Sequence, residues 1–486
     1  MNLRSTTTGD GETVIREVID VAAPVVPQPS ATYLESLQAR LSRTPAPHAI
    51  PVPSPPLTFA ARFLIWKQDP TVGEPGIRTA YIPGLILNGP KDARITTELA
   101  GTTPVARNVN TDFIFTAGTP QFDCAHTWAV VRQTLTMIER VRDGIPVPWA
   151  WNTGGNTNVL TVHPRAGVTA NAYYSRGQKA LKFFHFTPAN SSTPVYTCRS
   201  LDIVAHEAGH AILDGLKPGW LGVGNPPQTG GLHESFGDLT AIFLALAQLD
   251  QAEAVIALSK ANLHDKNFIA AMAEQFGAAL GRPMGLRNAD NDLKLSQVSN
   301  EVHAISQVFT GGIYDVLADI FAFEWQRQSK SKDPAHVLLE VARHLCKLLL
   351  EAIVAAPASR ATYASVVNKM LSISHGQGDP AIYRQFLRSR FTLREVVVSP
   401  TPLTALAEGR FDLTDPNFTE GKDTLEMEPS DVPASIDAPQ DRSGCCGTMM
   451  LPEFTMVEQS VVESGDPLSD EEILGDETKE LKKAFK

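Results

Sequence analysis

Residues 201–215 read LDIVAHEAGHAILDG, an apolar stretch that carries two histidines and a glutamate. Its apolar residues recur at helical intervals, and Gly215 followed by Pro218 supplies a stop, so the stretch predicts one buried helix. His206 and His210 are four residues apart and lie on one face of that helix, about 5–6 Å apart at Cβ. Buried imidazoles are costly unless each finds a partner. Any fold for this chain must therefore bring polar groups from elsewhere against this face.

The spelling H-E-x-x-H is the one by which a single helical turn offers two imidazoles to a zinc ion and a carboxylate, here Glu207, to the water it binds. Alone the motif is weak, because a chain of this length contains one by chance about once in a hundred sequences. The alternative is a pair of structural histidines in the core. A catalytic zinc also needs a third protein ligand and an open position.

The third ligand is predicted downstream, in GGLHESFGDLTAIF, where Glu234 and Asp238 stand four residues apart on an amphipathic helix. Glu234 completes a set of two histidines and one glutamate, and Asp238 is placed to hold one histidine by its other ring nitrogen. His233 is a rival ligand, but it points about 100° away from Glu234 around the helix. The metzincin pattern, with a third histidine six residues after the second, does not occur. The alternative for the two acids is a solvated helix start.

With these motifs the chain resembles the thermolysin-like zinc metallopeptidases, the gluzincins, as a divergent member. DIVAHEAGHAILD is similar to the family's active-site helix, and HESFGD to the stretch that carries the third ligand and its aspartate partner. The likeness covers roughly 119–392. It implies an α+β, thermolysin-like fold with a β-rich N-terminal part, a mostly α-helical C-terminal part and the active-site helix between them.

The resemblance also implies further site residues. TANAYYSRGQ is similar to the family's edge-strand segment that binds substrate backbone, here through Asn171 and Ala172. GLRNAD places Arg287 at the substrate-carbonyl arginine, and NEVHAISQVF places His303 at the transition-state histidine. Asp214 falls at the aspartate one turn after the second histidine, in the shell around the ligands. Without the resemblance, His303 reads as a core histidine and Arg287 as a surface arginine.

The chain departs from the family's pattern around the reacting oxygen. Trp220 stands near the tyrosine that helps to bind the transition-state oxygen, which leaves Tyr174 as a candidate to share that task with His303. The acid that orients the family's histidine has no clear match here. Asn300 and Glu301 are the nearest polar candidates.

The expected cofactor is Zn²⁺. Asp202 matches one acid of the family's calcium site, but Ala245 stands where a glutamate is expected. This substitution argues against calcium dependence.

The implied function is neutral endopeptidase activity: a zinc-bound water hydrolyses the peptide bond with Glu207 as general base, and His303 stabilises the oxyanion. The substrate is a peptide or protein. The alternative is a catalytically weak or inactive zinc-containing module that binds peptides on the same fold. A dedicated aminopeptidase would carry a Gly-x-Met-Glu-Asn type motif, which the sequence lacks.

The charge distribution limits the classes of partner that we expect for this chain. Residues 423–486 contain 16 acidic and 5 basic residues, and the remainder of the chain is balanced. Without a basic stripe we expect no nucleic acid partner. No apolar run approaches the roughly 18 residues of a membrane span. The N-terminus lacks a secretory signal pattern, so we expect a cytoplasmic protein whose export would need a non-classical route.

The chain divides into five segments by composition and period. They are a disordered Pro-rich arm at 1–57, a β-rich segment at 58–118, an α+β half of the peptidase domain with the HExxH helix at 119–215, a helical half at 216–400, and an acidic, largely disordered tail at 410–486 that contains Cys445–Cys446 and has no known partner. Helical periods are predicted over 199–215, 232–250, 252–282, 299–327, 334–356 and 360–374.

Overall fold

The computed structural model describes residues 3–7, 13–17 and 60–396, apart from residues 74, 102, 153–158, 190, 223 and 283–284. Met1–Leu57 and Thr58–Lys486 form separate units. Within the first unit, β1 (Leu3–Thr7) pairs antiparallel with β2 (Thr13–Glu17). The rest of the predicted arm and the predicted acidic tail with its cysteine pair lie outside the described residues.

Strands occupy the early part of the second unit. The hairpin β3 (Ala60–Trp66) and β4 (Ile77–Pro83) is antiparallel. A mixed four-stranded sheet has the order β5-β6-β8-β7, made of β5 (Ile95–Thr97), β6 (Leu160–His163), β8 (Ala180–Phe183) and β7 (Ala172–Ser175). Its first three strands are parallel, and β7 runs antiparallel to β8 at the edge. Two short pairs complete the described strands: β9 (His185–Phe186) with β10 (Val195–Tyr196), and β11 (Ala271–Met272) with β12 (Arg287–Asn288).

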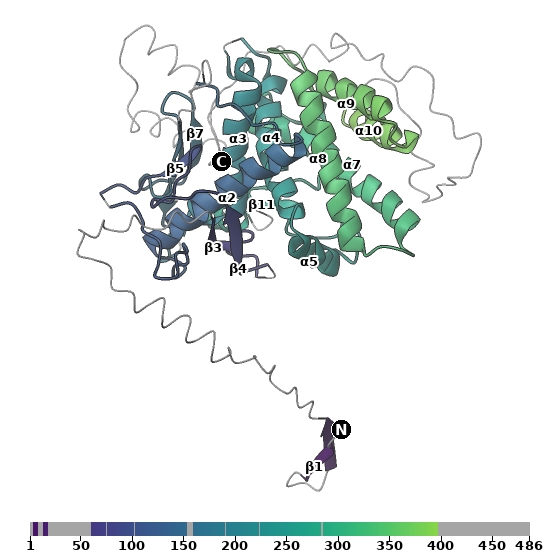
Figure 1. The fold of residues 1–486 in the computed structure, drawn as a ribbon. Helices are drawn as coiled ribbons and strands as arrows, with labels where there is room; N and C mark the ends of the chain where they lie inside the picture. Colours follow the sequence, from purple (N-terminus) through teal and green to yellow (C-terminus); the bar gives the residue numbers. More distant parts are fainter. Residues whose placement is uncertain are drawn as a thin grey trace, which may run out of the picture. The chain divides into compact units, whose positions relative to one another are not determined.

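Helices dominate the rest of the described chain (Figure 1). They are α2 (Pro120–Val141), α3 (Leu201–Leu216), α4 (Pro227–Leu246), α5 (Leu249–Ser259), α6 (Glu274–Ala279), α7 (Val302–Gln328), α8 (Pro334–Ala355), α9 (Tyr363–Gln377) and α10 (Ala381–Leu393). The second unit therefore mixes helices and strands, with the strands concentrated before α3 and the helices after it.

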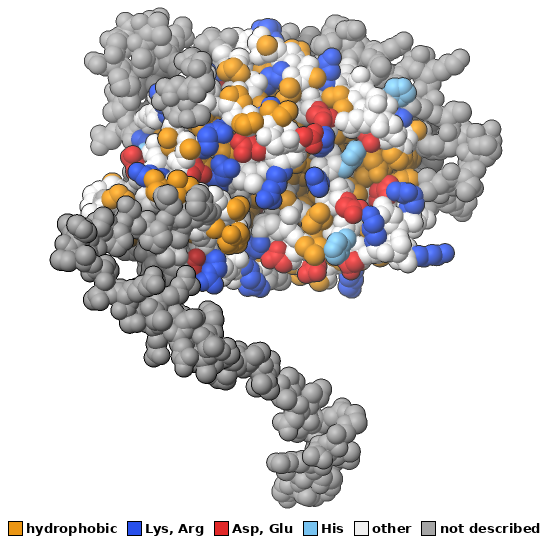
Figure 2. All heavy atoms as spheres, viewed as in Figure 1, with side chains coloured by type: hydrophobic (Ala, Val, Ile, Leu, Met, Phe, Trp, Pro, Cys, Tyr) orange, Lys and Arg blue, Asp and Glu red, His pale blue; other side chains and the backbone are white. Residues whose placement is uncertain are grey.

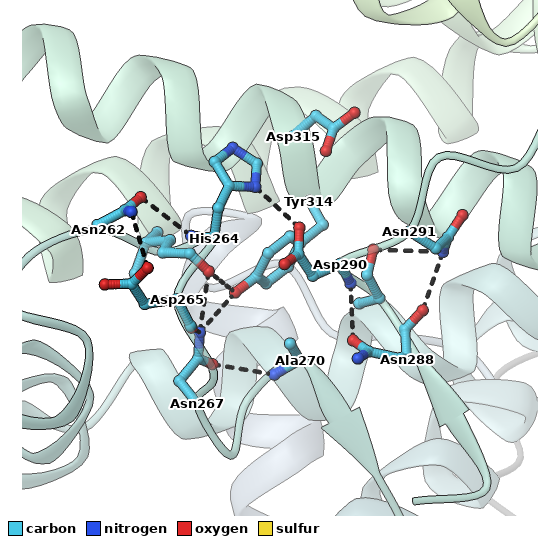
Figure 3. Close-up of polar contacts among 12 residues, drawn as sticks. Asn262, His264, Asp265, Asn267, Ala270, Asn288, Asp290, Asn291, Tyr314 and Asp315 are labelled. Carbon is cyan, nitrogen blue, oxygen red and sulfur yellow. Dashed lines mark hydrogen bonds and ion pairs between the residues drawn. The ribbon is translucent and has the colours of Figure 1, made fainter. Parts of the chain in front are cut away.

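The predicted helix over 252–282 is wrong beyond the end of α5. Lys260 and Ala261 have left-handed backbones, with φ of 51° and 62°, which end the helix. The side chain of Asn267 then donates to the Tyr314 hydroxyl at 3.0 Å, as Figure 3 shows. Its Oδ1 also accepts from the backbone N–H of Ala270 at 3.1 Å, and local bonds of this second kind compete with helical ones. The chain continues instead into β11 and the short α6.

One hydrophobic core joins the strands to the helices. Phe63 of β3 stacks on Trp128 of α2, with ring centroids 5.3 Å apart, and on Phe113 at 5.0 Å. Phe113 also forms an isolated parallel bridge with Phe63. α3 is buried from Leu201 to Asp214 and packs against α2, α4 and β7. The helix with the H-E-x-x-H motif is thus at the centre of the core.

Acidic and basic side chains are interspersed on the face shown in Figure 2, without a field of one sign. Among the described helices, none is long and apolar enough to span a membrane by itself. α4 and α5 reach that length and composition only together, across a bend of 96°.

Candidate metal centre

α3 and α4 approach each other closely at two glycines. A Cβ built on Gly209 of α3 would lie 3.2 Å from the Cα of Gly237 and 3.1 Å from the Thr240 hydroxyl. Larger residues at these positions would push the helices apart. The short separation lets side chains of α3 and α4 meet.

The two histidines of α3 meet the glutamate of α4. Nε2 of His206 lies 3.3 Å from Oε2 of Glu234, and Nε2 of His210 lies 3.6 Å from Oε1. One ligand atom from each side chain lies within 4.8 Å of the other two. All three side chains are buried. Two imidazole nitrogens and a carboxylate oxygen form a donor set that suits zinc.

The environment of these atoms fits a cation. Nε2 of His210 makes no hydrogen bond with any described residue, although it is buried. Burial would raise the pKa of Glu234, but the neighbouring imidazoles, with His303 first, hold it well below its usual value. A buried carboxylate kept ionised among imidazoles is a ligand ready for a metal ion.

A second carboxylate supports His206 from its other side. Oδ1 of Asp238 lies 2.8 Å from Nδ1 of His206, and Arg287 of β12 donates to Asp238 at 2.6 and 3.0 Å. Burial alone would raise the pKa of Asp238, but Arg287 and His206 lower it to about 2. The Asp238 carboxylate fixes the ring so that Nε2 faces Glu234. Arg287 thus contacts the metal centre through Asp238.

Glu207 follows the first histidine on α3 and is fully buried. Its pKa is raised to about 8, by burial first and by the Glu234 carboxylate in addition, against the opposing charge of His206. A carboxylate with a pKa near neutrality can both accept and return a proton.

His303 lies in the first turn of α7, next to Glu234. Its Nε2 is 3.1 Å from Oε2 of Glu234, and its Nδ1 is 2.5 Å from Oε1 of Glu301. Glu301 also caps α7 by accepting from the backbone N–H of His303 and of Ala304. Of the two polar candidates, Asn300 and Glu301, Glu301 is the one that contacts Nδ1 of His303. The sequence signal for this contact is an acid that stands two residues before a histidine at the start of a predicted helix.

Asn171 and Ala172 lie at the start of β7, the edge strand that packs against α3. The Asn171 side chain is buried and its Oδ1 accepts from the Ala172 N–H at 2.8 Å. The backbone carbonyl of Asn171 accepts from the Thr197 hydroxyl. These bonds fix the end of β7 that packs beside α3.

Asp214 contacts β7 and its following turn. Its Oδ2 accepts from the Tyr174 hydroxyl at 2.6 Å and from Nε of Arg176 at 2.7 Å. Asp214 thus ties the end of α3 to β7 and to the turn that follows it. Trp220 is buried as well, and its indole N–H donates to the carbonyl of Pro357 at 2.9 Å. The Tyr174 hydroxyl and the Trp220 indole therefore each donate their hydrogen to another group of the protein.

His233 precedes the glutamate of the centre, and helical spacing directs its side chain about 100° away from that of Glu234. Its Nδ1 lies 2.8 Å from Nδ1 of His210. His233 is therefore a partner of a ligand candidate, on the side of the ring that faces away from Glu234.

A second group, His264, Asp290 and Asp315, also brings three such atoms within 4.8 Å of one another. Figure 3 shows the His264 ring directed at the Asp290 carboxylate, at 2.8 Å. Arg394 donates to Asp315 at 2.9 Å, so a guanidinium already supplies positive charge. Asp290 and His264 are partly open to solvent. We interpret this group as an ion-pair cluster.

No family model matches this chain, and no curated protein matches it. Among solved structures, the precursor of protealysin, a metalloproteinase from Serratia proteamaculans, is similar with a TM-score of 0.41 and 12% identity. The match covers 62% of this chain and 87% of that one. A likeness of this size does not establish a shared fold, and the assignment of a function rests on the metal centre itself.

Proposed function

We propose that this chain is a zinc metalloendopeptidase of the thermolysin-like type. The observation that carries the proposal is the convergence of His206 and His210 from α3 with Glu234 from α4 in a buried site. Zinc bound by such a set polarises a carbonyl and lowers the pKa of a coordinated water to about 7.

The residues around the centre supply the remaining chemistry. Glu207 accepts a proton from the attacking water and delivers it to the leaving nitrogen, a role that its buried position beside His206 on α3 supports. Both ring nitrogens of His303 face carboxylate oxygens, an arrangement that favours a hydrogen on each. If a bound substrate displaces Glu234 from Nε2 of His303, the developing oxyanion can accept a hydrogen bond from that N–H group.

The edge strand provides a place for the substrate backbone. An extended peptide can add to a sheet edge through main-chain hydrogen bonds. β7 is such an edge and packs against α3, which carries His206 and Glu207. We propose that Asn171 and Ala172 hold the peptide there and that Arg287 binds a substrate carbonyl.

One observation favours a second function, a zinc-containing module that binds peptides with little or no turnover. The Tyr174 hydroxyl donates to Asp214 and Trp220 is bonded to the scaffold, so neither supplies a donor for a reacting oxygen.

Metal content and cleavage separate these functions. The full chain is expected to contain one equivalent of zinc by mass spectrometry and to cleave casein or a quenched peptide library until a zinc chelator is added. Zinc without cleavage supports the binding module, and a chain that takes up no zinc refutes both.

A further inference from the structure

The two histidine ligands of the proposed centre have different partners. Nδ1 of His206 faces Asp238, a carboxylate that can only accept. Nδ1 of His210 faces Nδ1 of His233 at 2.8 Å. An imidazole nitrogen donates or accepts according to its tautomer, so the second contact has two arrangements and the first has one.

Only one arrangement of the histidine pair leaves His210 able to bind a metal. If the shared hydrogen sits on Nδ1 of His210, Nε2 keeps a lone pair towards Glu234, whose Oε1 is 3.6 Å away. If it sits on Nδ1 of His233, the neutral His210 carries its own hydrogen on Nε2, which then faces the Glu234 carboxylate. A neutral imidazole holds one hydrogen on its two nitrogens, so these states exclude each other.

We propose that His233 is a positioning residue that accepts a hydrogen bond from Nδ1 of His210 and thereby holds His210 in its metal-binding tautomer. When zinc occupies Nε2 of His210, the hydrogen on that nitrogen leaves as a proton and the shared hydrogen passes from Nδ1 of His233 to Nδ1 of His210. His233 takes up a proton on its Nε2 in exchange, so the pair keeps two hydrogens and no net charge. His206 needs no such change, because Asp238 fixes its tautomer in advance. The inference rests on the proposed zinc centre and assigns to His233 a role that excludes it as a ligand.

Burial makes the contact hard to replace. His210 and His233 are both fully buried, and their rings are stacked with centroids 5.0 Å apart. If His233 lost its acceptor, the Nδ1–H of His210 would be left buried without a partner, which destabilises that tautomer. Removal of an outer partner of this kind typically weakens metal affinity by about 10- to 100-fold.

The test compares zinc affinity in three variants of the full chain, by competition with a chromophoric chelator. His233→Leu removes the acceptor and is expected to weaken zinc binding by about 10- to 100-fold. His233→Asn keeps an acceptor oxygen and is expected to stay within about threefold of wild type. The control is Thr229→Val, which removes another buried hydrogen bond of α4, from Thr229 to the carbonyl of Ala361 at 2.7 Å. It is expected to lower stability without changing zinc affinity.

The tautomers are read directly by ¹⁵N NMR of the histidine rings, with and without zinc. In the zinc-loaded wild type the hydrogens are expected on Nδ1 of His210 and Nε2 of His233. A hydrogen on Nδ1 of His233 in that state overturns the inference even if the leucine variant does not fold. So does equal weakening by all three substitutions, or wild-type affinity in His233→Leu. If the wild type binds no zinc, the proposed function falls and the inference with it.

Discussion

Gly237 lies directly against the imidazole of His206. A Cβ at position 237 would be 2.6 Å from Nδ1 of His206, closer than a Cβ approaches any other heavy atom. The same glycine faces Gly209 of α3. Absence of a side chain at position 237 therefore determines both how near the helices lie and where the first histidine points.

Gly237→Ala tests this relationship. The added methyl must displace the His206 ring or separate α3 from α4, and overpacking of this kind costs about 1–3 kcal/mol. We expect a lower urea midpoint and zinc affinity weakened more than tenfold. The control is Gly376→Ala in α9, where a Cβ meets nothing within 4 Å. That change is expected to be neutral or to stabilise by up to about 1 kcal/mol. Equal behaviour of the two variants would contradict the role of Gly237.

Glu207→Gln separates proton transfer from metal binding. The amide keeps the size of the side chain but cannot accept the proton, so kcat is expected to fall by at least about 10²- to 10⁴-fold. Zinc content by mass spectrometry should remain at the wild-type level, because Glu207 is outside the ligand set. Glu253→Gln, on the exposed side of α5, serves as the matched control. Near-normal cleavage by Glu207→Gln refutes the general-base assignment.

Glu301 is expected to act through His303. His303→Ala should lower kcat/KM by about 10²- to 10³-fold, the range for loss of an oxyanion donor. Glu301→Ala should cause a smaller loss that disappears in the His303→Ala background, because the two residues share one function. Additive losses in the double variant would show that Glu301 acts independently.

Glu301 also caps α7, and loss of the cap alone costs about 1 kcal/mol. Glu301→Asn keeps a good capping residue but withdraws the oxygen from Nδ1 of His303. We expect it to retain near wild-type stability and to lose activity as the alanine variant does. Thermal unfolding and kcat/KM, measured on the same samples, distinguish capping from orientation.

His126 of α2 predicts a pH dependence of stability away from the metal centre. Its ring is buried and accepts from the Trp66 N–H at 3.3 Å. Burial, aided by Arg199 and opposed by Asp123, lowers its pKa from 6.5 to about 4. The unfolded chain therefore takes up a proton below pH 6.5 that the folded protein refuses until about pH 4. Stability due to this group is complete above pH 6.5, and about 3 kcal/mol of it is lost as the pH falls to 4.

Urea unfolding between pH 4 and 8 measures this effect in the wild type and in His126→Gln. The variant is expected to lose stability less steeply below pH 6.5, and the two profiles should run parallel between pH 7 and 8. Parallel profiles over the whole range would contradict the lowered pKa.

Helical spacing was sufficient to predict that His206 and His210 share one face of α3, because it fixes the direction of each side chain. Glu234 was predicted to meet that face because it completes a donor set for zinc, and the structure brings the three side chains together. The 100° argument correctly placed His233 off the face of Glu234, but spacing within one helix cannot show that this other direction leads to Nδ1 of His210.

Two features could not be predicted from the sequence pattern, because they depend on tertiary contacts and on local backbone conformation. Apolar periodicity suggested a helix through 252–282, yet the left-handed Lys260 and Ala261 and the bond from Asn267 to Tyr314 interrupt it. A short-range pattern contains no information about a tyrosine 47 residues away. Likewise, the choice of Glu301 over Asn300 depends on how α7 begins, which the capping bonds decide.

Residues 233–238 of α4 carry the ligand candidate Glu234. They also carry His233 and Asp238, the partners of the imidazoles of His210 and His206. Insertion or deletion of one residue inside this interval would rotate everything beyond it by about 100° and withdraw Asp238 from His206. The stretch from Gly222 to Pro226 leads into the helix and is exposed at Gly222 and Gly224, and exposed connections tolerate changes in length. Homologues that keep this chemistry should accordingly preserve the interval residue for residue, while the connection before it grows or shrinks.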